Sequence, residues 1–172
     1  MQLIHGDCLE KMKDIPDKSI DMVLCDLPYG TTACKWDVAI PFEPLWEQYK
    51  RIIKDRGAIV LFGNQPFTTL LIASNLSGFK YCLQWDKKIP AGMSYARFRP
   101  MQQTEDIAIF TENGGVSNYY PQMIKRDKPI VSGGTKKSES APIAHKDPNF
   151  KKTYEEKQPI TLIAFDKIRK GS

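Results

Sequence analysis

The sequence predicts an α/β domain with a largely parallel sheet, and a basic segment toward its carboxyl end. Strand-like and helix-like segments alternate through the first 112 residues, a pattern typical of parallel strands joined by helices. The positive charge is distributed differently. Residues 1–112 hold 13 Lys and Arg against 14 Asp and Glu, whereas residues 113–172 hold 12 against 6. A basic segment beside a neutral domain suggests contact with a polyanion.

The composition is that of an ordinary globular protein. The 172 residues are 41% hydrophobic and 26% charged, enough for one core. No apolar run approaches the ~20 residues that span a bilayer, and the amino end does not have the pattern of a secretory signal. We therefore expect a cytoplasmic protein with no membrane partner. Its four cysteines show no C-x-x-C spacing and no neighbouring histidines, so we expect no metal site.

The first two strand-like segments each lead to an acidic residue. Residues 3–5 give a short strand signal that ends before Asp7, and residues 9–12 give a short helix. Residues 19–25 are expected to form a buried strand with Asp26 at its carboxyl end. Ligands of open α/β sheets bind beyond the carboxyl ends of strands, so both acidic residues are candidates for a site.

Helices and strands then alternate as far as residue 111. Residues 41–54 place apolar side chains at three- and four-residue steps, which predicts an amphipathic helix that ends at Gly57. The apolar run 58–63 predicts a strand buried on both faces. A helix and two strands are expected next, at residues 65–76, 79–85 and 106–111.

Three regions follow from these patterns. Residues 1–112 are interpreted as the α/β region. Residues 113–158 contain two Gly-Gly pairs, four prolines, many lysines and scattered aromatic residues, and are interpreted as an inserted basic region. Residues 159–172 begin with an apolar run, interpreted as a strand that returns to the first region.

The segment Asp26-Leu27-Pro28-Tyr29 suits methylation of an amine on an aromatic ring, a nitrogen whose lone pair is delocalised. The Asp26 carboxylate and the Leu27 carbonyl can accept its two N–H hydrogens and free the lone pair for attack. Pro28 removes a competing amide donor. The Tyr29 ring, more than its hydroxyl, can stack on a flipped base, worth ~1–3 kcal/mol. The alternative is a strand-end turn with an exposed Asp.

Residues 1–112 as a whole resemble the beta-class amino DNA methyltransferases, particularly the phage-type adenine enzymes. The matching segments are Gly6-Asp7-Cys8-Leu9-Glu10, Ser19-Ile20-Asp21-Met22-Val23, residues 26–32, Trp36-Asp37, Leu61-Phe62-Gly63, Trp85-Asp86-Lys87, Arg99-Pro100 and residues 105–110. The resemblance implies a Rossmann-like methyltransferase sheet and S-adenosyl-L-methionine as the methyl donor. It also implies methyl transfer to adenine N6 in double-stranded DNA after base flipping, an activity of restriction-modification systems.

Residue by residue, the resemblance assigns Asp26, Leu27, Pro28 and Tyr29 to the catalytic tetrad, with Leu27 where Pro is commoner. The first three of these, together with Asp7 and Cys8, are expected to contact the cofactor. An initial Asp favours adenine over cytosine. Contacts with DNA phosphates are expected from eight basic residues: Lys88, Arg97, Arg99, Lys125, Arg126, Lys128, Lys136 and Lys137.

Two features of the family are not found in the sequence. They are a His-Pro-Thr-Gln-Lys-Pro-like stretch and a Phe-x-Gly-x-Gly-like cofactor loop. The glycine pairs 114–115 and 133–134 follow no predicted buried strand, so they are not substitutes. Residues 1–112 also supply only half of a doubly wound sheet and leave a central strand unpaired. We therefore expect weak or no cofactor binding by this chain alone, and a longer parent gene or a second chain, such as a homodimer partner, to complete the sheet.

Two alternatives stay open at this point. A non-catalytic fragment would keep the base pocket and the basic segment and would only bind DNA. Another aminomethyltransferase, acting on cytosine N4, RNA or a glutamine side chain, would use a related tetrad. Glutamine enzymes have Asn in first position and no long basic insertion, which favours DNA. The sequence gives neither the recognition site nor a restriction partner.

Overall fold

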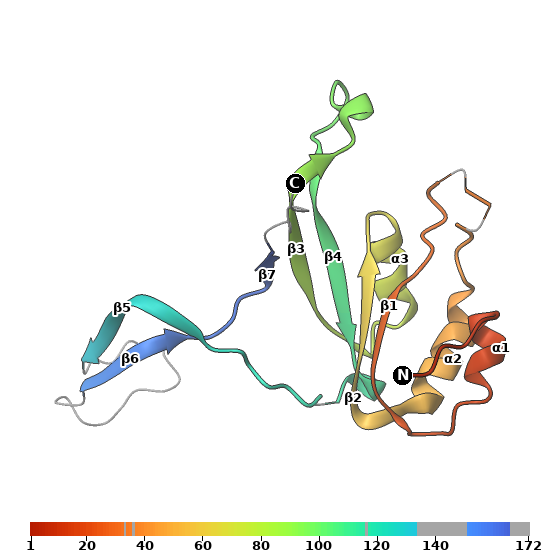
Figure 1. Ribbon diagram of the computed structural model, residues 1–172, viewed down its shortest axis with the longest axis horizontal. Helices are drawn as coiled ribbons and strands as arrows, with labels where there is room; N and C mark the ends of the chain where they lie inside the picture. The colour runs from red at the N-terminus through yellow and green to blue at the C-terminus, as the bar shows by residue number, and fades with distance from the viewer. Residues whose placement is uncertain (33, 36, 116, 134–150, 166–172) are drawn as a thin grey trace. The chain divides into compact units, whose positions relative to one another are not determined.

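The computed structural model describes the chain except residues 33, 36, 116, 134–150 and 166–172 (Figure 1). The chain divides into two compact units. One contains Met1–Asn118 and the segment that starts at Thr161, and the other contains Tyr119–Ile160. The first unit holds a five-stranded sheet and three α-helices, and the second holds a two-stranded sheet.

The sheet of the first unit has the strand order β1-β2-β4-β3-β7. Its strands are β1 (Ile20–Asp26), β2 (Ile53–Gly63), β3 (Phe79–Ala91), β4 (Gln102–Phe110) and β7 (Leu162–Ala164). β1 pairs with β2 and β3 with β7 in parallel, whereas β4 lies antiparallel between β2 and β3. Four strands therefore share one direction and β4 opposes them. The prediction of an α/β fold with a largely parallel sheet is confirmed.

Three helices pack against one face of this sheet. They are α1 (Cys8–Met12), α2 (Phe42–Ile52) and α3 (Phe67–Ser74), with short 3-10 turns η1 (Met93–Tyr95) and η2 (Glu112–Gly114) elsewhere. α2 begins directly after Pro41, and its buried side chains recur at steps of one, three and three residues: Leu45, Trp46, Tyr49 and Ile52. This is the apolar stripe that the sequence predicted.

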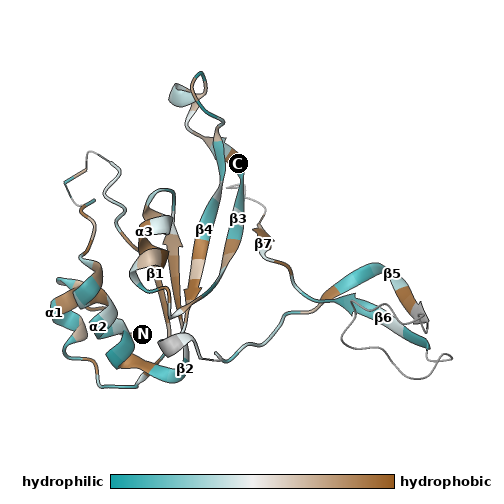
Figure 2. Ribbon diagram, turned by 180° about the vertical axis from the view of Figure 1, so that it is seen from behind, coloured by the Kyte–Doolittle hydropathy of each residue, from teal (hydrophilic) through white to brown (hydrophobic). Residues whose placement is uncertain are grey.

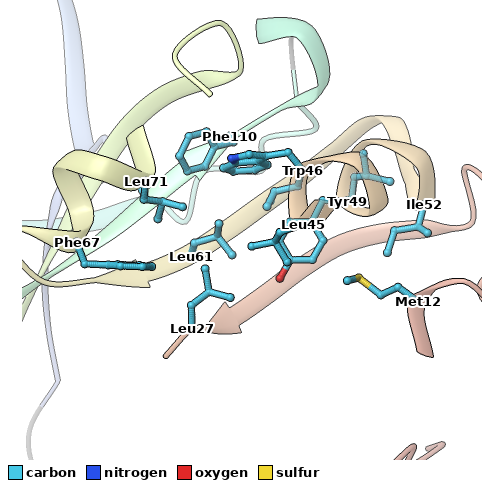
Figure 3. Packing of buried hydrophobic residues seen from close by; sticks show 13 residues of the cluster. Met12, Leu27, Leu45, Trp46, Tyr49, Ile52, Leu61, Phe67, Leu71 and Phe110 are labelled. Atoms are coloured by element: carbon cyan, nitrogen blue, oxygen red, sulfur yellow. The ribbon is translucent and has the colours of Figure 1, made fainter. Parts of the chain in front are cut away.

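The core lies between the helices and the sheet (Figure 3). Leu45, Leu61, Leu71 and Phe110 are fully buried there. The Trp46 ring lies 4.8 Å from that of Phe110 between centroids. Its indole N–H donates to the Ser74 hydroxyl at 2.7 Å, so the polar atom of this buried residue is satisfied.

Two predicted elements differ in the structure. Residues 3–5 are exposed and form no strand, because no neighbouring strand of the described chain pairs with them. α2 ends at Ile52, and Gly57 lies inside β2 instead of ending the helix. A Cβ at Gly57 would lie 2.9 Å from the Asp21 carbonyl oxygen, so the close approach of β1 requires glycine there.

The predictions of buried strands at residues 19–25 and 58–63 are only partly right. β2 alternates between buried and half-buried residues, so only one of its faces is closed. β1 is more open, with Met22 and Leu24 54% and 59% exposed. β1 is the outermost strand on its side of the sheet in the part of the chain that the structure describes.

The glycine pair 114–115 does follow a buried strand, contrary to expectation. It comes directly after β4, in and beside η2. Gly114 has φ +69°, and a Cβ there would lie 2.5 Å from the Ser77 carbonyl oxygen. Because β4 is antiparallel to β2, this turn lies at the edge of the sheet opposite to Asp26. The pair therefore shapes a turn remote from the candidate site.

The second unit is a hairpin of β5 (Ile124–Gly133) and β6 (Lys151–Lys157), paired antiparallel. Figure 2 shows it mostly in the colours of hydrophilic residues. The Lys152 ammonium group lies 5.2 Å from the centroid of the Tyr154 ring, within the range of a cation–π contact.

Membrane and metal features were also assessed for the described ranges. Among the helices described there, none has both the length and the apolar character that a bilayer crossing requires. The same residues contain no group of three or more His, Cys, Asp and Glu side chains placed to hold a metal ion.

Candidate functional site

The segment Asp26-Leu27-Pro28-Tyr29 leaves the sheet at the carboxyl end of β1. Because β1, β2 and β3 run in one direction, the connection from β3 to β4 lies at this same edge. Leu27 is 5% exposed and points into the core toward Leu61 (Figure 3). The core therefore anchors this segment by its second residue and leaves Asp26 exposed to solvent.

The Tyr29 side chain connects two carboxylates. Its hydroxyl oxygen lies 2.7 Å from Asp26 Oδ1 and 3.0 Å from Glu105 Oε1. Burial, and then the hydrogen bond to Asp26 and the charge of Glu105, raise the pKa of Tyr29 well above its usual value. The ring stacks on Phe67 with centroids 5.0 Å apart and a tilt of 30°. Tyr29 is therefore a neutral phenol with both its ring and its hydroxyl held.

Glu105 is a member of this site that sequence reasoning did not assign. It is buried at 9% exposure near the start of β4. Lys87 Nζ lies 2.6 Å from Glu105 Oε2 and 5.9 Å from the centroid of the Trp85 ring. The only signal in the sequence is an acidic residue just before the apolar run 107–110. Its contact with Tyr29 follows from strand pairing, which the sequence does not reveal.

Asp37 fixes the loop that follows the tetrad. Its carboxylate accepts hydrogen bonds from the amides of Gly30 at 2.8 Å, Thr31 at 3.0 Å and Thr32 at 2.7 Å. A hydrogen bond from the Thr32 side chain and the Gly30 amide are the main causes that lower the pKa of Asp37 to about 2. Sequence analysis noted Asp37 only as part of the resemblance, and the structure gives it this loop-holding role.

A pocket opens beside the tetrad with a volume of about 420 Å³. This volume lies within the range of small-molecule sites. The lining residues come from the tetrad and the loop after it: Asp26, Leu27, Pro28, Tyr29, Thr31, Thr32 and Asp37. The structure thus brings the four predicted tetrad residues together around one cavity.

Asp7 and Cys8 are at the amino end of α1. Asp7 Oδ1 caps this helix by accepting from the Leu9 amide at 2.9 Å and from the Glu10 amide at 3.3 Å. Burial raises the pKa of both Cys8 and Cys25, and the charge of Cys8 adds to the effect on Cys25. The α1 start therefore lies beside the end of β1, but Asp7 and Cys8 do not line the pocket at the tetrad.

The basic candidates of the first unit lie in or near the connection from β3 to β4. Lys88 Nζ is 3.4 Å from Asp86 Oδ2, so its charge is partly compensated. Arg97 and Arg99 are exposed, and the Arg99 guanidinium lies 5.4 Å from the centroid of the Tyr95 ring. These two arginines share the sheet edge of Asp26. Phe98 between them is 86% exposed, which the sequence pattern did not indicate.

The other basic candidates belong to the second unit. Lys125 and Lys128 are exposed on β5, and Lys125 pairs with Glu156 of β6 in the strand register. Arg126 Nε donates to the Glu156 carbonyl oxygen at 3.1 Å. Lys136 and Lys137 lie outside the described residues.

Comparisons with known proteins were made by sequence and by structure. No protein-family model matches the chain. In sequence it is similar to the Type II methyltransferase M.HinfI of Haemophilus influenzae, with 31% identity over 85 aligned residues. The match covers 36% of this chain and 24% of the relative, so the chain matches about a quarter of that protein's length.

Three solved structures illustrate the similarity in fold. The M1.HpyAVI–SAM complex has a TM-score of 0.49 and 20% identity, covering 72% of this chain and 59% of that one. The PvuII DNA methyltransferase (cytosine-N4-specific) has 0.49 and 14%, covering 64% and 49%. A DNA modification methylase of Thermus thermophilus, TTHA0409, complexed with S-adenosyl-L-methionine, has 0.48 and 16%, covering 67% and 56%. At these scores the likeness carries no argument about chemistry.

Proposed function

We propose that this chain carries the base-binding and catalytic part of a DNA methyltransferase that acts on adenine N6 with S-adenosyl-L-methionine as methyl donor. The observation that supports this most is the placement of Asp26, Leu27, Pro28 and Tyr29 around one pocket at the carboxyl edge of the sheet. Sequence similarity to a methyltransferase supports the same conclusion.

The chemistry follows from two acceptors beside a stacking ring. The Asp26 carboxylate and the Leu27 carbonyl accept the two N–H hydrogens of the adenine amine and favour a geometry that frees its lone pair. Bound S-adenosyl-L-methionine supplies the methyl group for this nitrogen. Asp26 faces solvent and passes to water the proton that the nitrogen then has in excess. The Tyr29 ring, supported by Phe67, replaces part of the stacking that a flipped base loses.

The residues of the first unit fit a methyl donor of this kind. The pocket of about 420 Å³ adjoins the exposed Asp26 carboxylate, which suits a cationic donor. Asp7 uses Oδ1 for the helix cap, and its carboxylate remains exposed beside the β1 end. We propose that Asp7 holds the adenine amine of the cofactor there, with Cys8 beside it.

We propose double-stranded DNA as the partner of the basic residues. The described part of the second unit carries six Lys and Arg against three Asp and Glu. Arg97 and Arg99 add positive charge at the edge of the pocket. Such residues bind phosphates and release counterions, so affinity falls as salt rises.

Exchanging Lys125 and Lys128 together for alanine is expected to reduce the salt dependence of DNA binding. Because the variant neutralises two fewer phosphates, the slope of log K against log salt falls in magnitude by about 2. Fluorescence anisotropy of a labelled duplex across a salt series measures the slope. Lys13→Ala is the control, because Lys13 is an exposed lysine of the first unit paired with Glu10 at 2.9 Å. An unchanged slope in the double variant would place the phosphate contacts elsewhere.

A further inference from the structure

The Tyr29 hydroxyl has one proton and two acceptors within reach. Its oxygen is 2.7 Å from Asp26 Oδ1 and 3.0 Å from Glu105 Oε1. A phenol can donate to only one carboxylate at a time. In the free protein the shorter contact is to Asp26, which is the carboxylate that the proposed function assigns to the substrate amine. The hydroxyl and the amine therefore compete for Asp26.

We propose that Glu105 is a positioning residue that takes the Tyr29 hydroxyl bond when Asp26 accepts the amine of the substrate base. The inference rests on the proposed function. The exchange needs only a rotation of the hydroxyl hydrogen about its C–O bond, so no covalent bond breaks and no proton is transferred. Asp26 Oδ1 then becomes free for the base.

The surroundings of Glu105 suit this role. It is buried, and Lys87 Nζ at 2.6 Å occupies its other oxygen, Oε2. Oε1 is therefore directed to Tyr29. The Phe67 ring packs against that of Tyr29, which keeps the hydroxyl between the two carboxylates while its hydrogen turns. Burial and both carboxylates raise the pKa of Tyr29, so the hydroxyl keeps its hydrogen.

Glu105→Gln reverses the preference of the hydroxyl. Lys87 has only donors, so the amide oxygen of the glutamine turns toward it. The amide NH₂ group then faces Tyr29 and donates to the phenol oxygen. The phenol hydrogen is left to Asp26, where it obstructs the amine. Removing the hydroxyl in addition, with Tyr29→Phe, ends the competition.

A binding experiment on the full chain tests this without requiring turnover. The probes are two single-stranded oligonucleotides, one with unmodified adenine and one with N6,N6-dimethyladenine, which has no N–H to donate. A single-stranded probe avoids the cost of base flipping. The ratio of their dissociation constants measures recognition of the amine. Glu112→Gln is the matched control, since Glu112 also pairs with a lysine, Lys18, but at the far end of β4.

We expect the wild type and Glu112→Gln to favour unmodified adenine. Glu105→Gln should lose about tenfold of this preference, the value of one charged hydrogen bond, and the double variant with Tyr29→Phe should regain it. A double variant that stays as poor as Glu105→Gln, or a Glu105→Gln variant equal to wild type, would overturn the role of Glu105 alone. A wild type with no preference would contradict amine recognition at Asp26, and both proposals with it.

Discussion

Replacing Asp26 with alanine is expected to reduce the rate of methyl transfer to DNA at least about 100-fold. The reason is that the variant loses the carboxylate that orients the amine and removes its proton, effects typically worth roughly 10²–10⁴-fold. The fold should be unaffected. Asp26 is exposed at the end of β1, and the buried Leu27 holds the segment in place.

Single-turnover incorporation of a labelled methyl group measures this rate. Asp21→Ala is the matched control, because Asp21 is an exposed aspartate on the same strand whose Oδ1 lies 2.7 Å from Lys54 Nζ. Circular dichroism and urea unfolding establish that both variants are folded. An Asp26→Ala variant that keeps more than about a tenth of the wild-type rate would remove Asp26 from the chemistry.

Phe110→Ala is expected to lower the free energy of unfolding by about 3–5 kcal/mol. Phe110 is 0% exposed, and its ring centroid lies 4.8 Å from that of Trp46 and 5.7 Å from that of Phe79. The truncation leaves a cavity at the place where α2, β3 and β4 meet. Such a loss approaches half of the stability of many domains.

Urea unfolding followed by tryptophan fluorescence measures the change. Phe98→Ala is the control, since Phe98 is 86% exposed in the connection from β3 to β4 and should change the free energy of unfolding by less than about 0.5 kcal/mol. Equal effects of the two substitutions would mean that the core is not centred on Phe110.

Much of the fold could be predicted because apolar periodicity is a local signal. The stripe of α2 and the run of β2 are visible in the sequence, and so is the position of Asp26 at the end of a strand. Exposure of β1 could not be predicted in this way. An apolar run such as residues 19–25 is compatible with burial on both faces, and only the sheet order shows β1 at the outer side with Leu24 exposed.

The candidate site was predictable only where its residues are adjacent in sequence. The tetrad 26–29 is continuous, so its chemistry could be inferred from the residues themselves. Glu105 is separated from Tyr29 by 76 positions and reaches it through the position of β4. Asp37 holds the loop 30–32 by bonds to amides, for which the sequence carries no distinctive pattern. Contacts through strand pairing and loop closure require the structure.

The central claim is that this chain methylates adenine N6 in DNA, and the chemical identity of the product tests it most directly. DNA amplified in vitro contains no modified bases and can be incubated with excess protein and millimolar S-adenosyl-L-methionine that carries an isotope-labelled methyl group. Digestion to nucleosides and mass spectrometry then separate the possible products. We predict labelled N6-methyldeoxyadenosine with the wild type and none with Asp26→Ala. Labelled N4-methyldeoxycytidine, or the absence of any labelled nucleoside, would contradict the claim.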